Sequence, residues 1–139
     1  MSSILDGLPV GGTVTMDTAP LIYYLEDHPD FADRYAPVFD AAANGTLRIA
    51  VSAVTLAEVL AGPLKAGNEI LAARYRAMLS PRIVPVTEEI AALAARFRAA
   101  YRLRLPNAIQ VATAVVTGSV ALVTRDADFS QVREIRVVS

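Results

Sequence analysis

Cysteine is absent from this chain of 139 residues, and histidine occurs only once. The absence of cysteine excludes disulfide bonds, thiolate nucleophiles and cysteine-ligated zinc, and it fits a reducing compartment. The single histidine, His28, lies in the polar stretch EDHPD, where neither a Ser-His-Asp triad nor a multi-histidine metal site is easy to build. Any catalysis is therefore expected to depend on carboxylates.

Charged residues are also few, and their signs nearly cancel. The 13 basic and 14 acidic side chains give a formal net charge of −1, which predicts no strongly basic surface and only local contact with nucleic acid. The start of the chain lacks a basic region followed by an apolar one, and Pro106 and Gly118 interrupt the uncharged stretch 105–124. We expect a cytoplasmic protein without a membrane span.

The remaining composition is apolar, with 54% hydrophobic residues, 19% charged residues and a mean hydropathy of +0.41. These values suggest elements that are buried on more than one face, as in a layered α/β domain. The length indicates one domain. We expect residues 1–139 to form it, with 1–12 as a loosely ordered N-terminal segment.

Short apolar runs alternate with helical periodicity along the chain. Strands are predicted at 13–16, 47–52, 82–86, 120–124 and 134–138. Helices are predicted at 18–26, 31–43, 54–62, 65–79, 87–102 and 106–118. Ser52 or Thr55 can start the third, and Gly62 and Pro63 close it. Because no hairpin signal separates the strands, we expect right-handed crossovers and a mostly parallel three-layer α/β/α sandwich.

Four polar side chains stand where packing alone does not require them. Asp17 and Asp126 follow the first and fourth strands, Glu58 is the only charge in SAVTLAEVLAGPL, and Asn107 opens an otherwise apolar helix. Each has a simple structural explanation, such as capping or exposure to solvent. Together they suggest convergence at the carboxyl edge of the sheet, where open α/β sheets build their sites.

Clustered carboxylates repel one another, so a divalent cation is their natural counter-charge. Oxygen ligands without histidine or cysteine suit hard cations, Mg²⁺ or Mn²⁺. Such sites commonly carry out phosphoryl transfer or phosphodiester hydrolysis.

Four stretches, VTMDTAPLIYYLE, VSAVTLAEVLAGP, LRLPNAIQVATAV and LVTRDADF, follow in this order over residues 13–129. In this combination the chain resembles the PIN-domain ribonucleases, in particular the VapC-type toxins of bacterial toxin-antitoxin pairs. The resemblance implies a Rossmann-like PIN fold, cleavage of RNA with Mg²⁺ or Mn²⁺, a homodimer, and inhibition by a small antitoxin protein.

On this resemblance Asp17 and Asp126 would be metal ligands, Glu58 a further ligand or a nearby carboxylate, and Asp128 an auxiliary acid. The third acid of the family pattern LPDA is replaced by Asn107 in LPNA. Asparagine keeps one carbonyl ligand but loses the charge, so weakened metal binding is expected. A natural loss of activity and a deliberate change that permits production of a toxic protein both fit this residue.

Two other functions remain open. Asn107 favours a catalytically inactive PIN-like binding module that captures antitoxin or RNA without cutting it. A phosphate-accepting receiver-like domain also carries acids at strand ends, but here Lys65 lies away from a late strand end and no second acid adjoins Asp17.

Two further patterns are better explained without RNA. In RFRAAYRLR the residues Arg98 and Arg102 share a helix face, which favours a solvated surface over an RNA-binding stripe. Tyr23 and Tyr24 lie among apolar neighbours, which favours packing in the core or in a dimer over base stacking.

Overall fold

The structure is a computed structural model that describes residues 2–139. Its strands form one sheet in the order β3-β2-β1-β4-β5, and all neighbouring strands are parallel. The strands are β1 (Thr13–Met16), β2 (Arg48–Ser52), β3 (Ile83–Val84), β4 (Ala121–Val123) and β5 (Val137–Val138). The predicted parallel sheet is confirmed.

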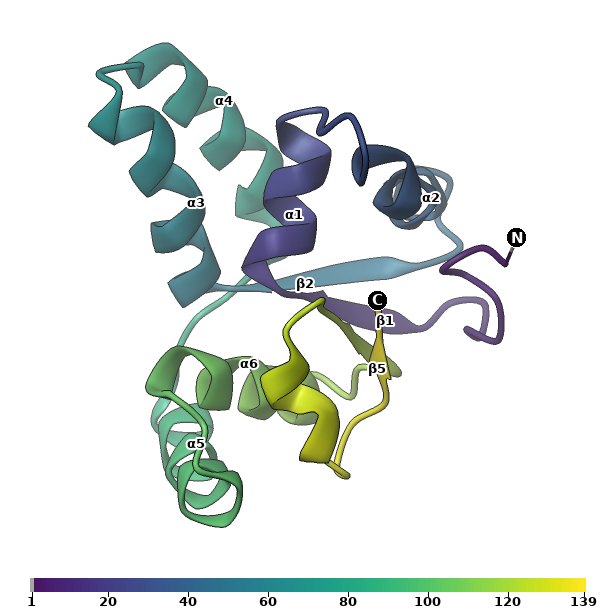
Figure 1. Ribbon diagram of the computed structural model, residues 1–139, viewed down its shortest axis with the longest axis vertical. Helices are drawn as coiled ribbons and strands as arrows, with labels where there is room; N and C mark the ends of the chain where they lie inside the picture. The colour runs from purple at the N-terminus through teal and green to yellow at the C-terminus, as the bar shows by residue number, and fades with distance from the viewer. Residues whose placement is uncertain (1) are drawn as a thin grey trace.

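Helices cover both faces of this sheet. The α-helices are α1 (Thr18–Leu25), α2 (Ala32–Ala43), α3 (Ala53–Lys65), α4 (Glu69–Leu79), α5 (Glu88–Tyr101) and α6 (Leu105–Val116). Two short 3-10 helices are η1 (Ser80–Arg82) and η2 (Ala127–Gln131). In Figure 1, α1 to α4 lie above the strands and α5 and α6 lie below them, so the α/β/α sandwich is confirmed.

The sheet separates two hydrophobic cores, and β4 contributes to both. Ala121 and Val123 belong to the core beneath α1 and α2, whereas Leu122 belongs to the core formed with α5 and α6. All three side chains are fully buried. Because both faces of the strand are covered, VALVT needs no alternation of polar and apolar residues.

Helix α3 is longer than the sequence predicts. Gly62 and Pro63 do not close it, since the helix continues to Lys65, and that prediction was wrong. Pro63 removes one backbone donor, but its ring is buried and this packing offsets the loss. The carbonyls of Gly62 and Pro63 still accept bonds from the backbone N–H groups of Ala66 and Asn68.

The tyrosine pair of α1 packs within the domain. The ring centroids of Tyr24 and Phe39 lie 3.7 Å apart in a stacked arrangement, and those of Tyr23 and Phe31 lie 4.9 Å apart. The rings of Tyr23 and Tyr24 therefore pack against aromatic rings of the same domain. From the N-terminal segment, Ile4 is buried in the same core.

No helix within residues 2–139 is long and apolar enough to cross a membrane.

Tyr101, the last residue of α5, forms a hydrogen bond with Glu134 in the segment before β5. Its hydroxyl donates to Oε1 of Glu134 at 2.5 Å. This bond is the main reason that the pKa of Tyr101 is raised and the pKa of Glu134 is lowered. The contact therefore stabilises the fold above the unfolded pKa of glutamate, about 4.3, and below that of tyrosine, about 10.

Tyr101→Phe is expected to lower the free energy of unfolding slightly at pH 7. The difference from the unchanged chain should shrink as the pH falls through the lowered pKa of Glu134, because the protonated carboxyl no longer gains from the bond. Urea unfolding of both proteins in steps from pH 7 to pH 2 measures this difference. A difference that stays constant over the series would contradict the assignment.

Candidate active site

The acidic residues meet at the carboxyl ends of β1 and β4, which are neighbours in the sheet. In the sheet, β2 and β3 lie on one side of β1, and β4 and β5 lie on its other side, so the strand order reverses between β1 and β4. Asp17 follows β1 directly and Asp126 follows β4 closely. Ligands of open parallel sheets bind at such a reversal of strand order.

Asp17 is buried and its carboxylate is held by three donors. Its Oδ1 accepts from the backbone N–H of Thr18 at 2.8 Å and from Nε2 of Gln110 at 3.2 Å. Its Oδ2 accepts from the hydroxyl of Thr124 at 2.6 Å. The bond from Thr18 makes Asp17 the N-cap of α1, because it satisfies a free amide of the first turn. The orientation of the carboxylate is therefore fixed by the protein itself.

Asp126 is the N-cap of η2 and is more exposed. Its Oδ1 accepts from the backbone N–H of Asp128 at 2.9 Å. Its Oδ2 accepts from Nδ2 of Asn107 at 3.3 Å and lies 3.9 Å from Nη2 of Arg104. Asn107 is thus a direct neighbour of a predicted metal ligand, as the sequence suggested.

Two threonine hydroxyls connect the acids. The hydroxyl of Thr124 donates to Asp17 and accepts from the backbone N–H of Asp126 at 3.0 Å. The hydroxyl of Thr18 donates to Oε1 of Glu58 at 2.9 Å. Acidic residues from three distant parts of the chain are therefore linked by hydrogen bonds, Asp17 and Glu58 through their carboxylates and Asp126 through its backbone N–H.

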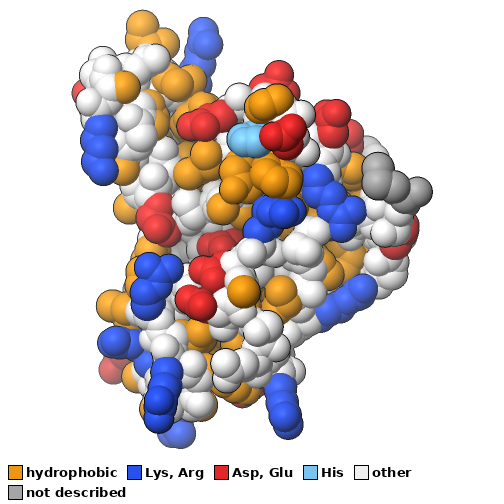
Figure 2. Space-filling view, in the orientation of Figure 1, with side chains coloured by type: hydrophobic (Ala, Val, Ile, Leu, Met, Phe, Trp, Pro, Cys, Tyr) orange, Lys and Arg blue, Asp and Glu red, His pale blue; other side chains and the backbone are white. Residues whose placement is uncertain are grey.

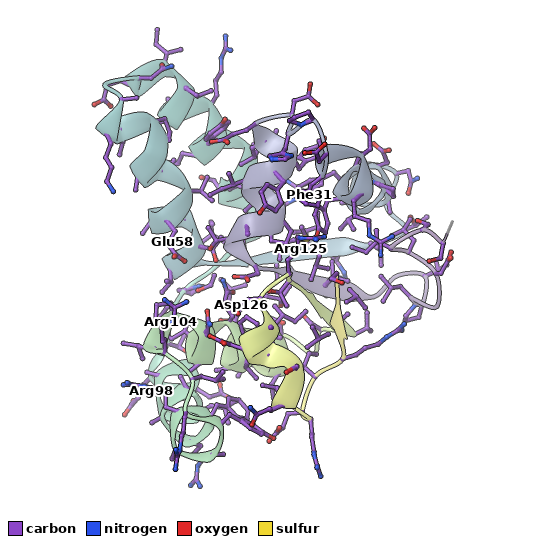
Figure 3. The ribbon with its side chains drawn as sticks, viewed as in Figure 1. Phe31, Glu58, Arg98, Arg104, Arg125 and Asp126 are labelled. Carbon is purple, nitrogen blue, oxygen red and sulfur yellow. The ribbon has the colours of Figure 1, made fainter. Side chains whose placement is uncertain are left out.

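The surface at this point is hollowed and acidic. Figure 2 shows acidic side chains gathered in a hollow beside α3, and Figure 3 shows Glu58 and Asp126 facing it with Arg104 below. Arg125 does not neutralise them, because its guanidinium lies 4.2 Å from the ring centroid of Phe31. Arg104 is 74% exposed, so its long contact with Asp126 is screened by water. The site therefore keeps an excess of negative charge.

Gln110 also belongs to this site, although the sequence analysis did not single it out. It is 1% exposed, and its Nε2 donates both to Asp17 and to the hydroxyl of Thr55, the latter at 2.5 Å. A signal existed, because Gln110 is a polar residue in an apolar helix and lies one turn after Asn107. Its Oε1 is buried and finds no partner among the described residues.

The donor set suits a hard divalent cation in kind, because carboxylates and an amide supply only oxygen ligands. Glu58 has a single protein donor and Asp17 has three, so both retain acceptor capacity. The Oε1 of Gln110, whose Nε2 donates to Asp17, is a further buried oxygen without a partner among the described residues. Within residues 2–139, however, no three His, Cys, Asp or Glu side chains group closely enough to hold an ion. Asp17, Glu58 and Asp126 share the site but do not form such a group.

Asp128 is less closely connected than the other predicted site residues. It is exposed, and the contact that the structure gives it with the site is made by its backbone N–H to Asp126. Its role as an auxiliary acid therefore stays a prediction.

The fold and this edge together define a Rossmann-like α/β protein with a carboxylate site at the reversal of strand order. The family model of the PIN domain matches residues 14–135, which is most of the chain. The chain belongs to the PIN-domain family, and the resemblance inferred from its four stretches is confirmed. No curated protein matches the chain.

Solved structures with the same fold include several complexes. A toxin-antitoxin complex from Klebsiella pneumoniae is 28% identical, with 91% of this chain and 96% of that chain covered and a TM-score of 0.70. VapBC2 from Rickettsia felis, bound to a DNA fragment from its promoter, is 20% identical, with 90% and 96% covered and a TM-score of 0.73. DNA-bound VapBC from Salmonella typhimurium is 18% identical, with the same coverage and a TM-score of 0.73.

Proposed function

We propose that this chain is a ribonuclease toxin that hydrolyses RNA phosphodiester bonds with Mg²⁺ or Mn²⁺ bound at Asp17 and Asp126. The observation that carries the proposal is that one hydroxyl, that of Thr124, donates to the carboxylate of Asp17 and accepts from the backbone N–H of Asp126, which places the two acidic residues side by side in a PIN domain. PIN domains are generally nucleases and generally use divalent metals. The excess of negative charge in the hollow supports binding of such a cation.

A bound divalent cation would supply neutralisation of the phosphate charge and activation of water. The residues of the chain do the positioning. Thr18, Gln110 and Thr124 hold the carboxylate of Asp17 in one orientation before any ligand arrives. Glu58, exposed and hydrogen-bonded to Thr18, accepts a proton from the attacking water.

Asn107 contributes a neutral carbonyl where the family pattern has an acid. It is 6% exposed and donates to Asp126, so its amide nitrogen is engaged while its carbonyl remains a candidate ligand. We infer that the cation binds more weakly here than it would beside a third carboxylate.

The similar solved structures also support a protein partner for this chain. The three solved structures described above are toxin-antitoxin or VapBC complexes, which supports a cognate antitoxin protein as the partner of this chain. Assembly as a homodimer is proposed on the family resemblance.

Cleavage of a single-stranded RNA of mixed sequence tests the function. We expect slow cleavage with Mn²⁺, none in EDTA, and a loss of at least about 100-fold for Asp17→Asn, which removes the charge of a ligand and keeps its shape. Asp128→Asn serves as a matched control, with a smaller loss. Equal cleavage in EDTA and in Mn²⁺ would overturn metal dependence.

The second candidate, an inactive binding module, is favoured by Asn107 and by the lack of a group of three acids within residues 2–139. It predicts that the chain binds RNA or antitoxin, and that neither the chain nor Asn107→Asp cuts RNA with Mn²⁺.

A further inference from the structure

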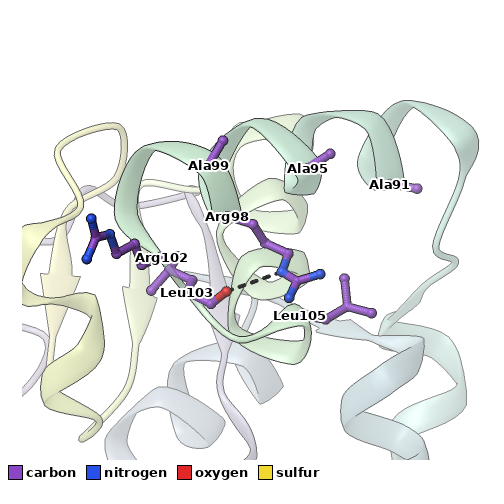
Figure 4. Close-up of a pocket in the computed structure, with 7 residues that line it drawn as sticks. All are labelled: Ala91, Ala95, Arg98, Ala99, Arg102, Leu103 and Leu105. Carbon is purple, nitrogen blue, oxygen red and sulfur yellow. Dashed lines mark hydrogen bonds between the residues drawn. The ribbon is translucent and has the colours of Figure 1, made fainter.

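Next to the acidic site, α5 and the loop that leads to α6 form a groove of about 560 Å³ (Figure 4). Three alanines of α5 form one side of it, at a spacing of four residues that puts them on one helix face. The other side chains that line it are those of Arg98, Arg102, Leu103 and Leu105. We propose that this groove binds the sugar-phosphate backbone of the RNA strand whose scissile bond enters the acidic site, a proposal that rests on the proposed function.

The groove lies in the one strongly basic part of the sequence. Residues 90–125 contain five arginines and no acidic residue, whereas the rest of the chain contains eight basic and 14 acidic side chains. Four of the five arginines come from the end of α5 and the loop after it: Arg96, Arg98, Arg102 and Arg104. A protein with a net charge of −1 therefore concentrates positive charge beside its acidic site.

Arg98 presents its charge to the groove, whereas Arg102 lines the groove with its guanidinium extending away from the other lining residues (Figure 4). Nε of Arg98 donates to the carbonyl of Leu103 at 3.3 Å, as Figure 4 shows, which fixes the guanidinium at the groove. Among the described residues its terminal nitrogens have no protein partner, and neither Arg98 nor Arg102 forms an ion pair. These donors are thus available to a ligand, and the solvated helix face expected from the sequence is one wall of a groove.

Arg104 connects the groove to the acids. Its side chain is 74% exposed, and its Nη2 lies 3.9 Å from Oδ2 of Asp126. In Figure 3, Glu58, Arg104 and Arg98 follow one another down the same side of the molecule. Positive charge thus continues from the edge of the acidic hollow along α5.

The chemistry of these groups favours a polyanion as the occupant. An acidic site repels RNA unless positive charge next to it holds the strand, and guanidinium groups bind phosphate oxygens through paired donors. The alanines leave room for a backbone to approach closely. Five of the seven lining residues are alanine or leucine, so the arginines supply the polar contacts of the groove, and the unpaired donors of Arg98 favour a phosphate backbone over a protein segment.

The test is binding of a labelled single-stranded RNA of mixed sequence, followed by fluorescence anisotropy in EDTA at several salt concentrations. The variant combines Arg98→Gln with Arg102→Asn. Glutamine keeps a donor for the carbonyl of Leu103, and asparagine tolerates the left-handed backbone of Arg102, whose φ is 55°. We expect the affinity to fall about tenfold or more and the salt slope to decrease by about 1.4, which corresponds to two lost phosphate contacts.

The matched control combines Arg74→Gln with Arg76→Gln on α4, which removes the same charge from exposed positions at the other end of the molecule (Figure 1). It should change the affinity by less than about twofold. Arg102→Asn alone leaves the contact between Arg98 and Leu103 intact and should show part of the loss, so the test does not depend on one variant folding.

The outcomes separate the groove from the function. Equal losses in the groove variant and the control, no loss in the groove variant, or no binding of RNA by the unchanged chain at low salt would each overturn the proposal. If the groove variant binds RNA as tightly as the unchanged chain, a protein segment becomes the better candidate for the occupant of the groove. Loss of binding in the groove variant only, together with no cleavage by the chain or by Asn107→Asp, would support the groove and overturn the nuclease.

Discussion

Asn107→Asp is expected to tighten the binding of Mn²⁺ by at least about tenfold. The change adds a negative charge beside Asp126, whose Oδ2 lies 3.3 Å from the amide nitrogen of Asn107. Two unit charges about 4 Å apart interact by about 4 kcal/mol at an effective dielectric of 20. Desolvation removes part of this gain, so about 1.4 kcal/mol, the equivalent of tenfold, is a lower bound. Isothermal titration calorimetry with Mn²⁺ measures it.

The same substitution should destabilise the protein when no metal is present. The carboxylate of Asp at position 107 cannot donate a hydrogen bond to Asp126 as the amide does, and its negative charge repels that of Asp126. The free energy of unfolding in EDTA should therefore fall by about 1–3 kcal/mol. Mn²⁺ should reverse the sign of the difference, because the cation binds the folded state. Asn107→Leu is the control: it loses the bond without gaining charge, so Mn²⁺ should not rescue it. Equal Mn²⁺ affinity for the chain and Asn107→Asp would refute the assignment.

Asp17→Ala is expected to lower the free energy of unfolding in EDTA by about 3 kcal/mol. It removes the acceptor of three donors, and two of these, Nε2 of Gln110 and the hydroxyl of Thr124, belong to side chains that are each 1% exposed and would lose their bond to Asp17. Hydrogen bonds to charged groups contribute about 1.5–3 kcal/mol each and an N-cap about 1 kcal/mol. Loss of the repulsion between Asp17 and Asp126 offsets part of the sum. Urea unfolding in EDTA measures the change.

Asp17→Asn separates the hydrogen bonds from the charge. Its carbonyl still accepts from Thr18 and Gln110, but its amide group faces the hydroxyl of Thr124, which already accepts from the backbone of Asp126. We expect a loss of about 1–2 kcal/mol, smaller than that of the alanine variant. Equal losses for the two variants would show that the hydrogen bonds of Asp17 contribute little.

The position of the acids could be predicted because it depends on local pattern and on one rule of sheet geometry. Apolar runs such as VALVT mark buried strands, and the ends of parallel strands meet at one edge. Asp17 and Asp126 follow such strands, so their proximity required no knowledge of side-chain contacts. Asn107 could likewise be singled out from the sequence alone, as a polar residue at the start of an otherwise apolar helix.

Other features depend on packing that no local pattern specifies. Pro63 is a usual helix terminator, but its ring is buried and α3 continues past it. Gln110 looks like one polar residue in an apolar helix until the sheet brings Asp17 to its amide, 93 positions away in the chain. Arg98 and Arg102 have the spacing of a solvated face, and only the loop after α5 turns that face into a groove.

The sequence by itself determined the class of fold, the family, and the edge of the sheet at which the acids gather, because hydrophobic periodicity and residue order carry that information. Only the tertiary structure decided that Thr124 joins Asp17 to Asp126 and that arginines form a groove beside them. These contacts unite residues from distant segments, so they depend on how helices and strands pack and on which rotamers that packing allows.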